Sequence, residues 1–180
     1  MRASLNSIAL LLVLSIHTQL AAQAGPPQTP APAQVIAAAR DIMQQARYCT
    51  LITIGPDGQP QARVVDPFLP DADLTIWMAT SALTRKVQEI GRDQRVTLVY
   101  FAPATFEYVT VIGKAVLNTE AAQKAAHWKT EWAALYKDQN RGEDYVLLRV
   151  KPSRLEVVST RRGINNDPKT WRPVTVNLPE

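Results

Sequence analysis

The sequence predicts a small antiparallel β-barrel with peripheral helices, which is an α+β fold. About five to seven short runs rich in β-branched residues recur along the chain, separated by Gly, Pro and Asp turns. One helical pattern precedes these runs and two more are inserted among them, so helices and strands do not alternate one for one. No G-x-G-x-x-G segment follows the first strand, which argues against a doubly wound parallel sheet.

Residues 1–24 are predicted to be a secretory signal peptide. Arg2 precedes the apolar run Ile8–Ile16, and Ala22-Gln23-Ala24 provides a cleavage site of small residues. The run is shorter than the roughly 20 apolar residues that cross a bilayer. We therefore expect export to the periplasm, with no stable membrane span after cleavage. An uncleaved N-terminal anchor is the alternative.

Composition narrows the functional classes. A chain of 180 residues suits one domain, and its net charge of +4 is spread without a basic stripe, so no nucleic-acid partner is expected. Cys49 is the only cysteine, and His127 is the only histidine beyond the signal peptide. One Cys and one His cannot supply the four ligands of a structural zinc site. We interpret Cys49 as a small buried core residue and His127 as a satisfied or exposed histidine on a helix, and we predict no metal site and no catalytic side chain.

The expected elements follow from periodicity and turn residues. Residues 25–33, GPPQTPAPA, are interpreted as an extended Pro-rich linker. Helices are expected at 34–47, at 82–90 and from 118 or 119 to about 135. Strands are expected at 48–54, 61–68, 74–80, 96–101, 106–117, 145–150 and 154–159, with Pro152 dividing the last two. The Asp57-Gly58 pair indicates a hairpin, and Gly113 inside a strand indicates a bulge or a close backbone approach.

The stretch Leu74–Gly91 is the first candidate functional site. A buried strand, LTIWMAT, leads directly into a short amphipathic helix whose first turns carry Arg85 and Lys86. Unpaired N–H groups at a helix start, together with hydroxyls and two cations, can seat a phosphate. The alternative is structural: Ser81 caps the helix and the two cations form a solvated face.

The order of the motifs resembles the pyridoxamine 5′-phosphate oxidase-like flavin-binding split barrels, and most closely their general stress protein branch. The segments that carry the resemblance are YCTLITIGPDGQP, ARVVDPF, WMATSALTRK, VTLVYF and DYVLLRVKP, spread over residues 34–159. The resemblance implies a split β-barrel of the FMN-binding type, with about six to seven antiparallel strands and two to three peripheral helices. Its domain would occupy residues 34–160, followed by a C-terminal tail at 161–180.

The resemblance also implies a cofactor site. In the family, cations of the second strand and of the helix that follows the third strand hold the FMN phosphate. The backbone of two aliphatic residues in the second strand lies along the flavin ring. Hydroxyl groups at the junction of the third strand and the helix contact the phosphate or the ring edge. The residues at these positions are Arg63, Val64, Val65, Thr80, Ser81, Thr84, Arg85 and Lys86. Because the family binds flavin at a two-fold interface, a homodimer is implied as well.

Departures from the oxidase pattern bear on the activity. Phe68 stands where the true oxidases carry a substrate-binding lysine, and Tyr108 stands in place of a flavin-contacting glutamine. Their Tyr/Arg/Ser substrate segment has no counterpart in AALYKDQNRGEDY. The sequence therefore indicates an FMN-dependent oxidoreductase that is not a pyridoxamine-phosphate oxidase.

Two alternative functions stay open at this point. The first is a non-catalytic stress-protection module that binds flavin or haem. The second is a barrel without catalytic activity, whose exposed aliphatic residues only form the interface of a dimer. In the tail, Trp171 is expected to dock on the barrel rather than fold over the flavin site.

Overall fold

The structure is a computed structural model that describes residues 29–179, so the predicted signal peptide lies outside the described residues. Seven strands and three α-helices are present in this part of the chain. The strands are β1 Cys49–Ile54, β2 Pro60–Val65, β3 Ile76–Ser81, β4 Arg95–Ala102, β5 Glu107–Asn118, β6 Tyr145–Val158 and β7 Val174–Asn177. The α-helices are α1 Pro32–Ala46, α2 Arg85–Arg92 and α3 Ala121–Ala126, and short 3-10 turns occupy Thr130–Ala134, Gln139–Arg141 and Thr160–Arg162.

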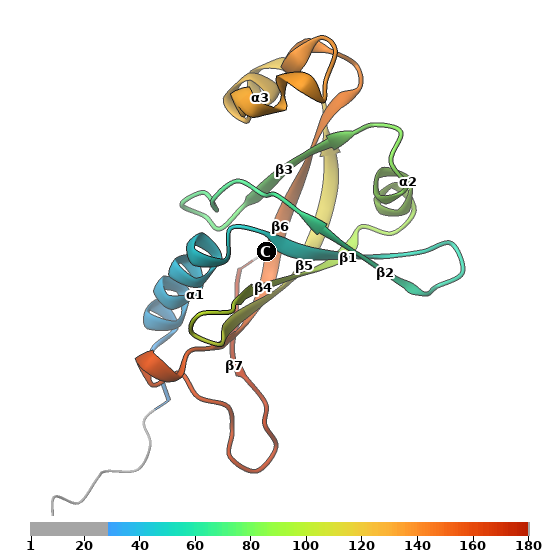
Figure 1. Cartoon of the computed structure of the whole chain (residues 1–180). Helices are drawn as coiled ribbons and strands as arrows, with labels where there is room; N and C mark the ends of the chain where they lie inside the picture. Colours follow the sequence, from blue (N-terminus) through green and yellow to red (C-terminus); the bar gives the residue numbers. More distant parts are fainter. Residues whose placement is uncertain (1–28, 180) are drawn as a thin grey trace, which may run out of the picture.

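All strand pairs are antiparallel, in the order β2-β1-β4-β5-β6-β3, and β7 adds to the outer side of β6 (Figure 1). The sheet curls until the segment after β2 meets β3, where Pro67 forms an isolated bridge with Met78. In the part of the chain that the structure describes, this bridge, the hydrogen bond from the Phe68 N–H to the Trp77 carbonyl and the one from Trp77 Nε1 to Asp71 join the two edges. The arrangement confirms the predicted split barrel with peripheral helices.

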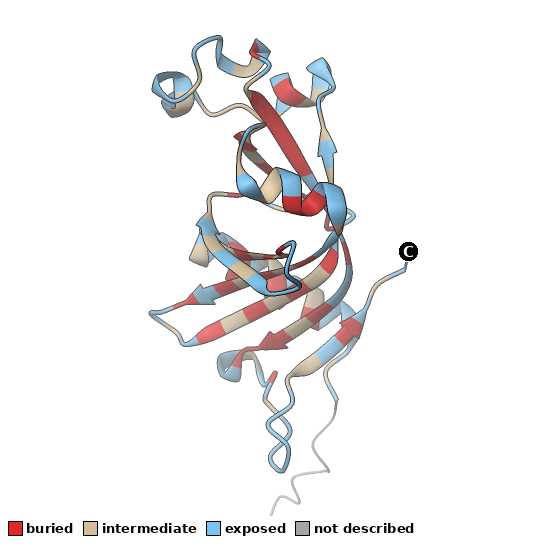
Figure 2. Ribbon diagram, turned by 90° about the vertical axis from the view of Figure 1, so that its right-hand side faces the viewer, coloured by how far each residue is buried: buried red, intermediate tan, exposed pale blue. Residues whose placement is uncertain are grey.

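The core lies between α1 and the concave side of the sheet. Val35, Ala39 and Ile42 on one face of α1 are fully buried, as the spacing of apolar residues predicts. They pack in one cluster with alternating residues of β1, β4 and β5, such as Leu51 and Leu98. Figure 2 shows that buried residues follow the strands, whereas the α3 end of the molecule is mostly exposed or intermediate. No helix within residues 29–179 is both long and apolar enough to cross a membrane.

The prediction of two strands divided at Pro152 is wrong, because β6 is one continuous strand. Its pairing with β5 shifts register at this point: Gly113 pairs with Pro152, whereas Ile112 pairs with Arg154. Ser153 is the extra residue of a β-bulge. Proline has no backbone N–H to donate to the neighbouring strand, and the bulge accommodates it without ending the pairing. The bulge or close backbone approach expected at Gly113 is confirmed, since the register shifts beside Gly113 and the β6 backbone lies close to it, although the extra residue belongs to β6.

The long helix expected to run to about residue 135 is also wrong. Asn118 still belongs to β5, and α3 ends at Ala126, before a turn and a separate 3-10 segment. The apolar spacing that suggested one helix comes instead from Trp128 and Trp132, which pack edge-on or tilted against Tyr145. The two tryptophans are therefore partly buried by contacts with an aromatic residue of β6 and not by lying on one face of a helix.

The tail is part of the sheet. Val174–Asn177 forms β7 and pairs with β6. At the other end of the chain, α1 begins at Pro32, inside the stretch interpreted as a linker. The expected docking of Trp171 is wrong, because its side chain is 76% exposed at a turn with a φ of 58°.

A buried carboxylate joins β5 to the chain after β6. Glu107 is fully buried and accepts hydrogen bonds from Ser159, Arg161 and Arg162. Burial by itself raises the pKa of this carboxyl, but the hydrogen bonds from Arg161 and Ser159 outweigh it and lower the pKa to about 2. Arg162 also reaches Asp41 of α1 at 3.1 Å, so the cluster ties three elements together.

This carboxylate predicts a pH dependence of stability. A depressed folded-state pKa contributes stability above the ordinary value of 4.5, and that stability is lost as the pH falls toward 2. We expect Glu107→Gln to lower the free energy of unfolding at pH 7 by about 1–2 kcal/mol, since Arg161 is half exposed and screened. Urea unfolding of both proteins at pH 7, 5 and 3.5 measures this. A gap that does not narrow at acid pH would contradict the assignment.

Candidate functional site

Arg63 lies on the face of β2 that turns toward α2. Side chains alternate along a strand, and Arg63 pairs across the hairpin with Leu51, which is fully buried. Val64, the next residue, projects to the opposite face and is 71% exposed. The hairpin turn at Asp57-Gly58, where Gly58 has a φ of 78°, fixes this register.

Glu89 of α2 is the centre of a cluster of charged side chains. It is fully buried, and its Oε2 accepts hydrogen bonds from Thr53 at 2.6 Å and from Arg63 Nη2 at 2.8 Å. Arg63 also donates through Nη1 to the Thr53 hydroxyl. On the other carboxylate oxygen, Arg85 Nε lies 2.9 Å from Oε1. We refer to Thr53, Arg63, Arg85, Lys86 and Glu89 as the cation cluster.

Lys86 belongs to the same electrostatic environment. It is half-buried, and burial together with the positive charge of Arg63 lowers its pKa, whereas Glu89 acts in the opposite direction. Burial alone would raise the pKa of Glu89, but the Thr53 and Arg63 hydrogen bonds lower it. The carboxylate is therefore ionised at neutral pH. Three cations surround one anion, so the cluster carries an excess of positive charge.

The hydroxyls of the strand–helix junction are arranged around the start of α2. Thr84 occupies the N-cap position, and its hydroxyl donates to the Ser81 carbonyl at 2.9 Å. Because that proton is used, the 3.2 Å contact between the Thr80 and Thr84 hydroxyls has Thr80 as the donor. Ser81 is the last residue of β3 and not the cap, so the helix starts three residues later than the sequence suggested.

The start of α2 offers backbone donors beside these cations. The Val87 N–H bonds back to the Thr84 carbonyl, whereas the amides of Arg85 and Lys86, as the first in the helix, have no carbonyl of their own helix to reach. Such free amides and the helix dipole favour an anion.

The sequence-predicted residues therefore fall into three groups. Arg63, Arg85 and Lys86 come together around Glu89. Thr80, Ser81 and Thr84 line the junction that leads into α2. The two valines of β2 separate: Val64 faces outward, whereas Val65 packs against the core.

Sequence reasoning missed Glu89 and Thr53. The spacing of Glu89, four residues after Arg85, allows an ion pair on one helix face, and that was the available signal. The Thr53 contact joins residues 36 apart and has no local signature. In residues 29–179 no group of three or more Cys, His, Asp or Glu is placed to hold a metal ion.

Solved structures share the fold at low sequence identity. A Clostridium acetobutylicum protein related to general stress protein 26 is 15% identical with a TM-score of 0.67, covering 82% of this chain and 96% of its own. General stress protein 26 from Bacillus anthracis is 18% identical with a TM-score of 0.62, covering 82% and 98%. A Nostoc punctiforme protein described as pyridoxamine 5′-phosphate oxidase-related and FMN binding is 15% identical with a TM-score of 0.56, covering 85% and 100%. No curated protein matches the chain.

At the level of sequence, the family described as pyridoxamine 5′-phosphate oxidase matches residues 35–159. This chain belongs to the pyridoxamine 5′-phosphate oxidase family. The matched segment runs from α1 to the end of β6 and contains the whole cation cluster.

In this family member, Phe68 is part of an aromatic cluster at the α3 end of the barrel. Its ring packs edge-on against His127 and Trp132, with centroids 5.0 and 5.6 Å away. Lys129 lies over the same ring and pairs with Asp66 at 2.9 Å. His127 also stacks on Trp77 at 4.6 Å, and its Nδ1 lies 3.0 Å from the Gln123 carbonyl oxygen, so the ring has a polar partner.

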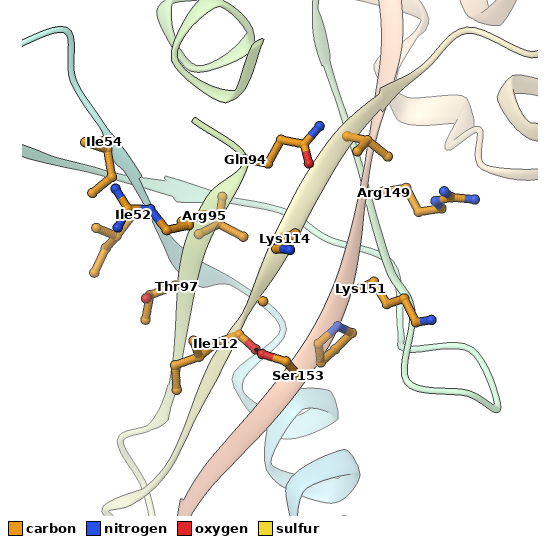
Figure 3. A pocket seen from close by; sticks show the side chains of 14 residues that line it. Ile52, Ile54, Gln94, Arg95, Thr97, Ile112, Lys114, Arg149, Lys151 and Ser153 are labelled. Carbon is orange, nitrogen blue, oxygen red and sulfur yellow. Dashed lines mark hydrogen bonds between the residues drawn. The ribbon is translucent and has the colours of Figure 1, made fainter. Parts of the chain in front are cut away.

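A groove of about 570 Å³ lies on the other face of the sheet, away from the cation cluster. Its apolar floor comes from residues that alternate with core residues, such as Ile52 and Ile112. Figure 3 shows Arg149 and Lys151 of β6 along one side and Arg95 on the opposite side. The residues that line the groove include cations but no carboxylate.

Proposed function

We propose that this protein binds FMN, with the phosphate seated between Arg63, Arg85, Lys86 and the start of α2. The observation that carries the proposal is the convergence of three cations, from two separate elements, around one buried carboxylate. A phosphate monoester carries close to two negative charges at neutral pH, which matches three cations less one carboxylate.

The residues present fit the group. The amides of Arg85 and Lys86 can donate to phosphate oxygens, and Arg63 keeps unused N–H donors after its bonds to Thr53 and Glu89. The strand pairing of β2 with β1 sets the position of Arg63, while α2 supplies the other cations. The backbone of Val64 and Val65 continues from the phosphate seat along the same strand, where a flavin ring would lie.

We infer further that the protein is an exported flavin-dependent oxidoreductase and not a pyridoxamine-phosphate oxidase. When bound, FMN supplies hydride transfer at its ring. The chain's own residues bind and orient the cofactor. Phe68, at the position of the oxidases' substrate lysine, is held among aromatic rings and offers no charge to a second phosphate.

An absorption spectrum of the protein recovered from a periplasmic fraction tests this proposal. A flavin spectrum, or its appearance after FMN is added to colourless protein, followed by bleaching with a reduced nicotinamide, supports the oxidoreductase. Protein that takes up no FMN would overturn the proposal. Recovery only from the cytoplasm would overturn the export part alone.

A second candidate function is a stress-protection module that binds flavin or haem without turnover. It is favoured by the aromatic packing around Phe68, where His127 stacks on Trp77 and the nearby cation Lys129 is already paired with Asp66. Bound flavin that no reduced nicotinamide or dye reduces, or a haem absorption band, would support this function over the first.

We also propose that the protein is a homodimer that uses the outer face of the sheet. The apolar floor of the groove and the exposed Val64 lie on this face, with cations at the edge, as in interfaces that have an apolar centre and a polar rim. Covering the face with a second copy would remove these aliphatic side chains from water.

We expect Ile112→Lys to shift the protein from dimer to monomer, because the substitution places a charge in the centre of this face. Light scattering after size exclusion measures the mass. Leu135→Lys is the matched control, since Leu135 is 72% exposed directly after the 3-10 segment at the α3 end. An unchanged mass for Ile112→Lys would exclude this face as the interface.

A further inference from the structure

We infer that Glu89 is an internal counter-ion, and that the phosphate of the ligand takes Arg85 away from it. The inference rests on the proposed function, because the ligand is the FMN phosphate. It assigns distinct roles to the two arginines: Arg63 is the fixed part of the seat, and Arg85 is the part that exchanges partners.

The Oε2 side of Glu89 is rigid. This oxygen accepts from both Thr53 and Arg63, and Thr53 in turn accepts from Arg63, which closes a three-membered network. The Arg63 side chain is only 19% exposed, and its strand is paired with β1 along its length. A guanidinium held at two points and largely enclosed keeps its orientation when a ligand arrives.

The Oε1 side is loose. Arg85 Nε lies 2.9 Å away as an ion pair, yet this buried oxygen accepts no hydrogen bond, so the contact lacks hydrogen-bond geometry. The Arg85 side chain is 63% exposed. An ion pair whose arginine is mostly exposed and poorly aligned contributes little stability, so a phosphate dianion can compete for that arginine.

The arrangement after exchange keeps the carboxylate compensated. Glu89 retains both of its Oε2 hydrogen bonds, including the one to a charged guanidinium. Arg85 starts the helix next to the free amides of its first turn, so its movement toward a phosphate there needs only side-chain rotation. Binding of the phosphate is therefore a competition between two anions for one arginine.

The variant Glu89→Gln separates this role from a structural one. The glutamine carbonyl oxygen can still accept from Thr53 and Arg63, whereas its amide nitrogen would face Arg85 and cannot accept from it. We expect affinity for FMN to rise about two- to fivefold, the contribution of one ion pair whose arginine is mostly solvent-exposed. Affinity for inorganic phosphate should rise similarly, and affinity for riboflavin, which has no phosphate, should stay unchanged.

Titrations of the full mature protein by flavin fluorescence, and by calorimetry for phosphate, give these affinities. Arg92→Gln is the matched control, because it changes the charge at the far end of α2 on an exposed residue. Arg85→Gln adds a second test: the gain from Glu89→Gln should disappear in the double variant, since no arginine is left to release.

The outcomes distinguish this inference from the proposed function. Suppose that the wild type binds FMN, and that Glu89→Gln weakens the binding of FMN and of riboflavin by the same factor. Glu89 then only maintains the fold, and the inference fails. If the wild type takes up no flavin but Glu89→Gln binds phosphate more tightly than the wild type, the inference stands and the flavin function fails. If neither protein binds FMN or phosphate, both are overturned.

Discussion

Replacing Gly113 by alanine is expected to destabilise the barrel by about 3 kcal/mol. A Cβ at this position would lie 2.3 Å from the Lys151 carbonyl oxygen and 2.9 Å from the Pro152 Cα. Both obstacles are backbone atoms of β6, so no side chain can swing aside. Relief would require the β5–β6 bulge to open, and these two strands form the longest pairing in the sheet.

The measurement is the urea midpoint, with Gly91→Ala as the matched control. A Cβ at Gly91 would meet nothing within 4 Å, and the residue lies in α2. Alanine there should stabilise the protein by about 0.5–1 kcal/mol, because glycine loses more backbone entropy in a helix. Equal midpoints for Gly113→Ala and the wild type would mean that the bulge relaxes at little cost.

The second large effect is expected for Arg63→Ala, which should weaken FMN binding by about 1.5–3 kcal/mol, the range for charge-assisted hydrogen bonds. The structure adds a folding cost that the sequence did not suggest. Removing Arg63 leaves the buried Glu89 with Thr53 and the loosely held Arg85. We expect the free energy of unfolding to fall by about 2 kcal/mol, less than for a fully orphaned buried charge.

Lys86→Ala separates the loss of FMN affinity from the loss of folding stability. No hydrogen bond or salt bridge joins Lys86 to another described side chain, and removing a half-buried cation next to Arg63 relieves repulsion. It should therefore weaken FMN binding with little change in stability. FMN titration and urea unfolding of both variants decide the matter. Unchanged FMN affinity in both variants would contradict the assignment of Arg63 and Lys86 to the FMN phosphate.

Local patterns were sufficient for most of the barrel. The alternation in β1 and β4, the Asp57-Gly58 hairpin and the close backbone approach at Gly113 follow from side-chain periodicity and the properties of glycine. The same rules failed between Asn118 and Leu135, where tryptophans at helical spacing pack on Tyr145 from a distant strand. They failed again at Pro152, because a bulge on β6 can be recognised only when Gly113 is placed opposite.

The sequence by itself determined the antiparallel barrel, its order of strands along the chain and the three cations of the cation cluster, since these depend on residue types and short-range spacing. Only the tertiary structure decided what those cations surround. Arg63 and Glu89 are 26 residues apart, and their contact exists because the β1–β2 hairpin and α2 meet on one side of the sheet. A buried carboxylate is stable only with such partners, and no local pattern specifies which distant residues will supply them.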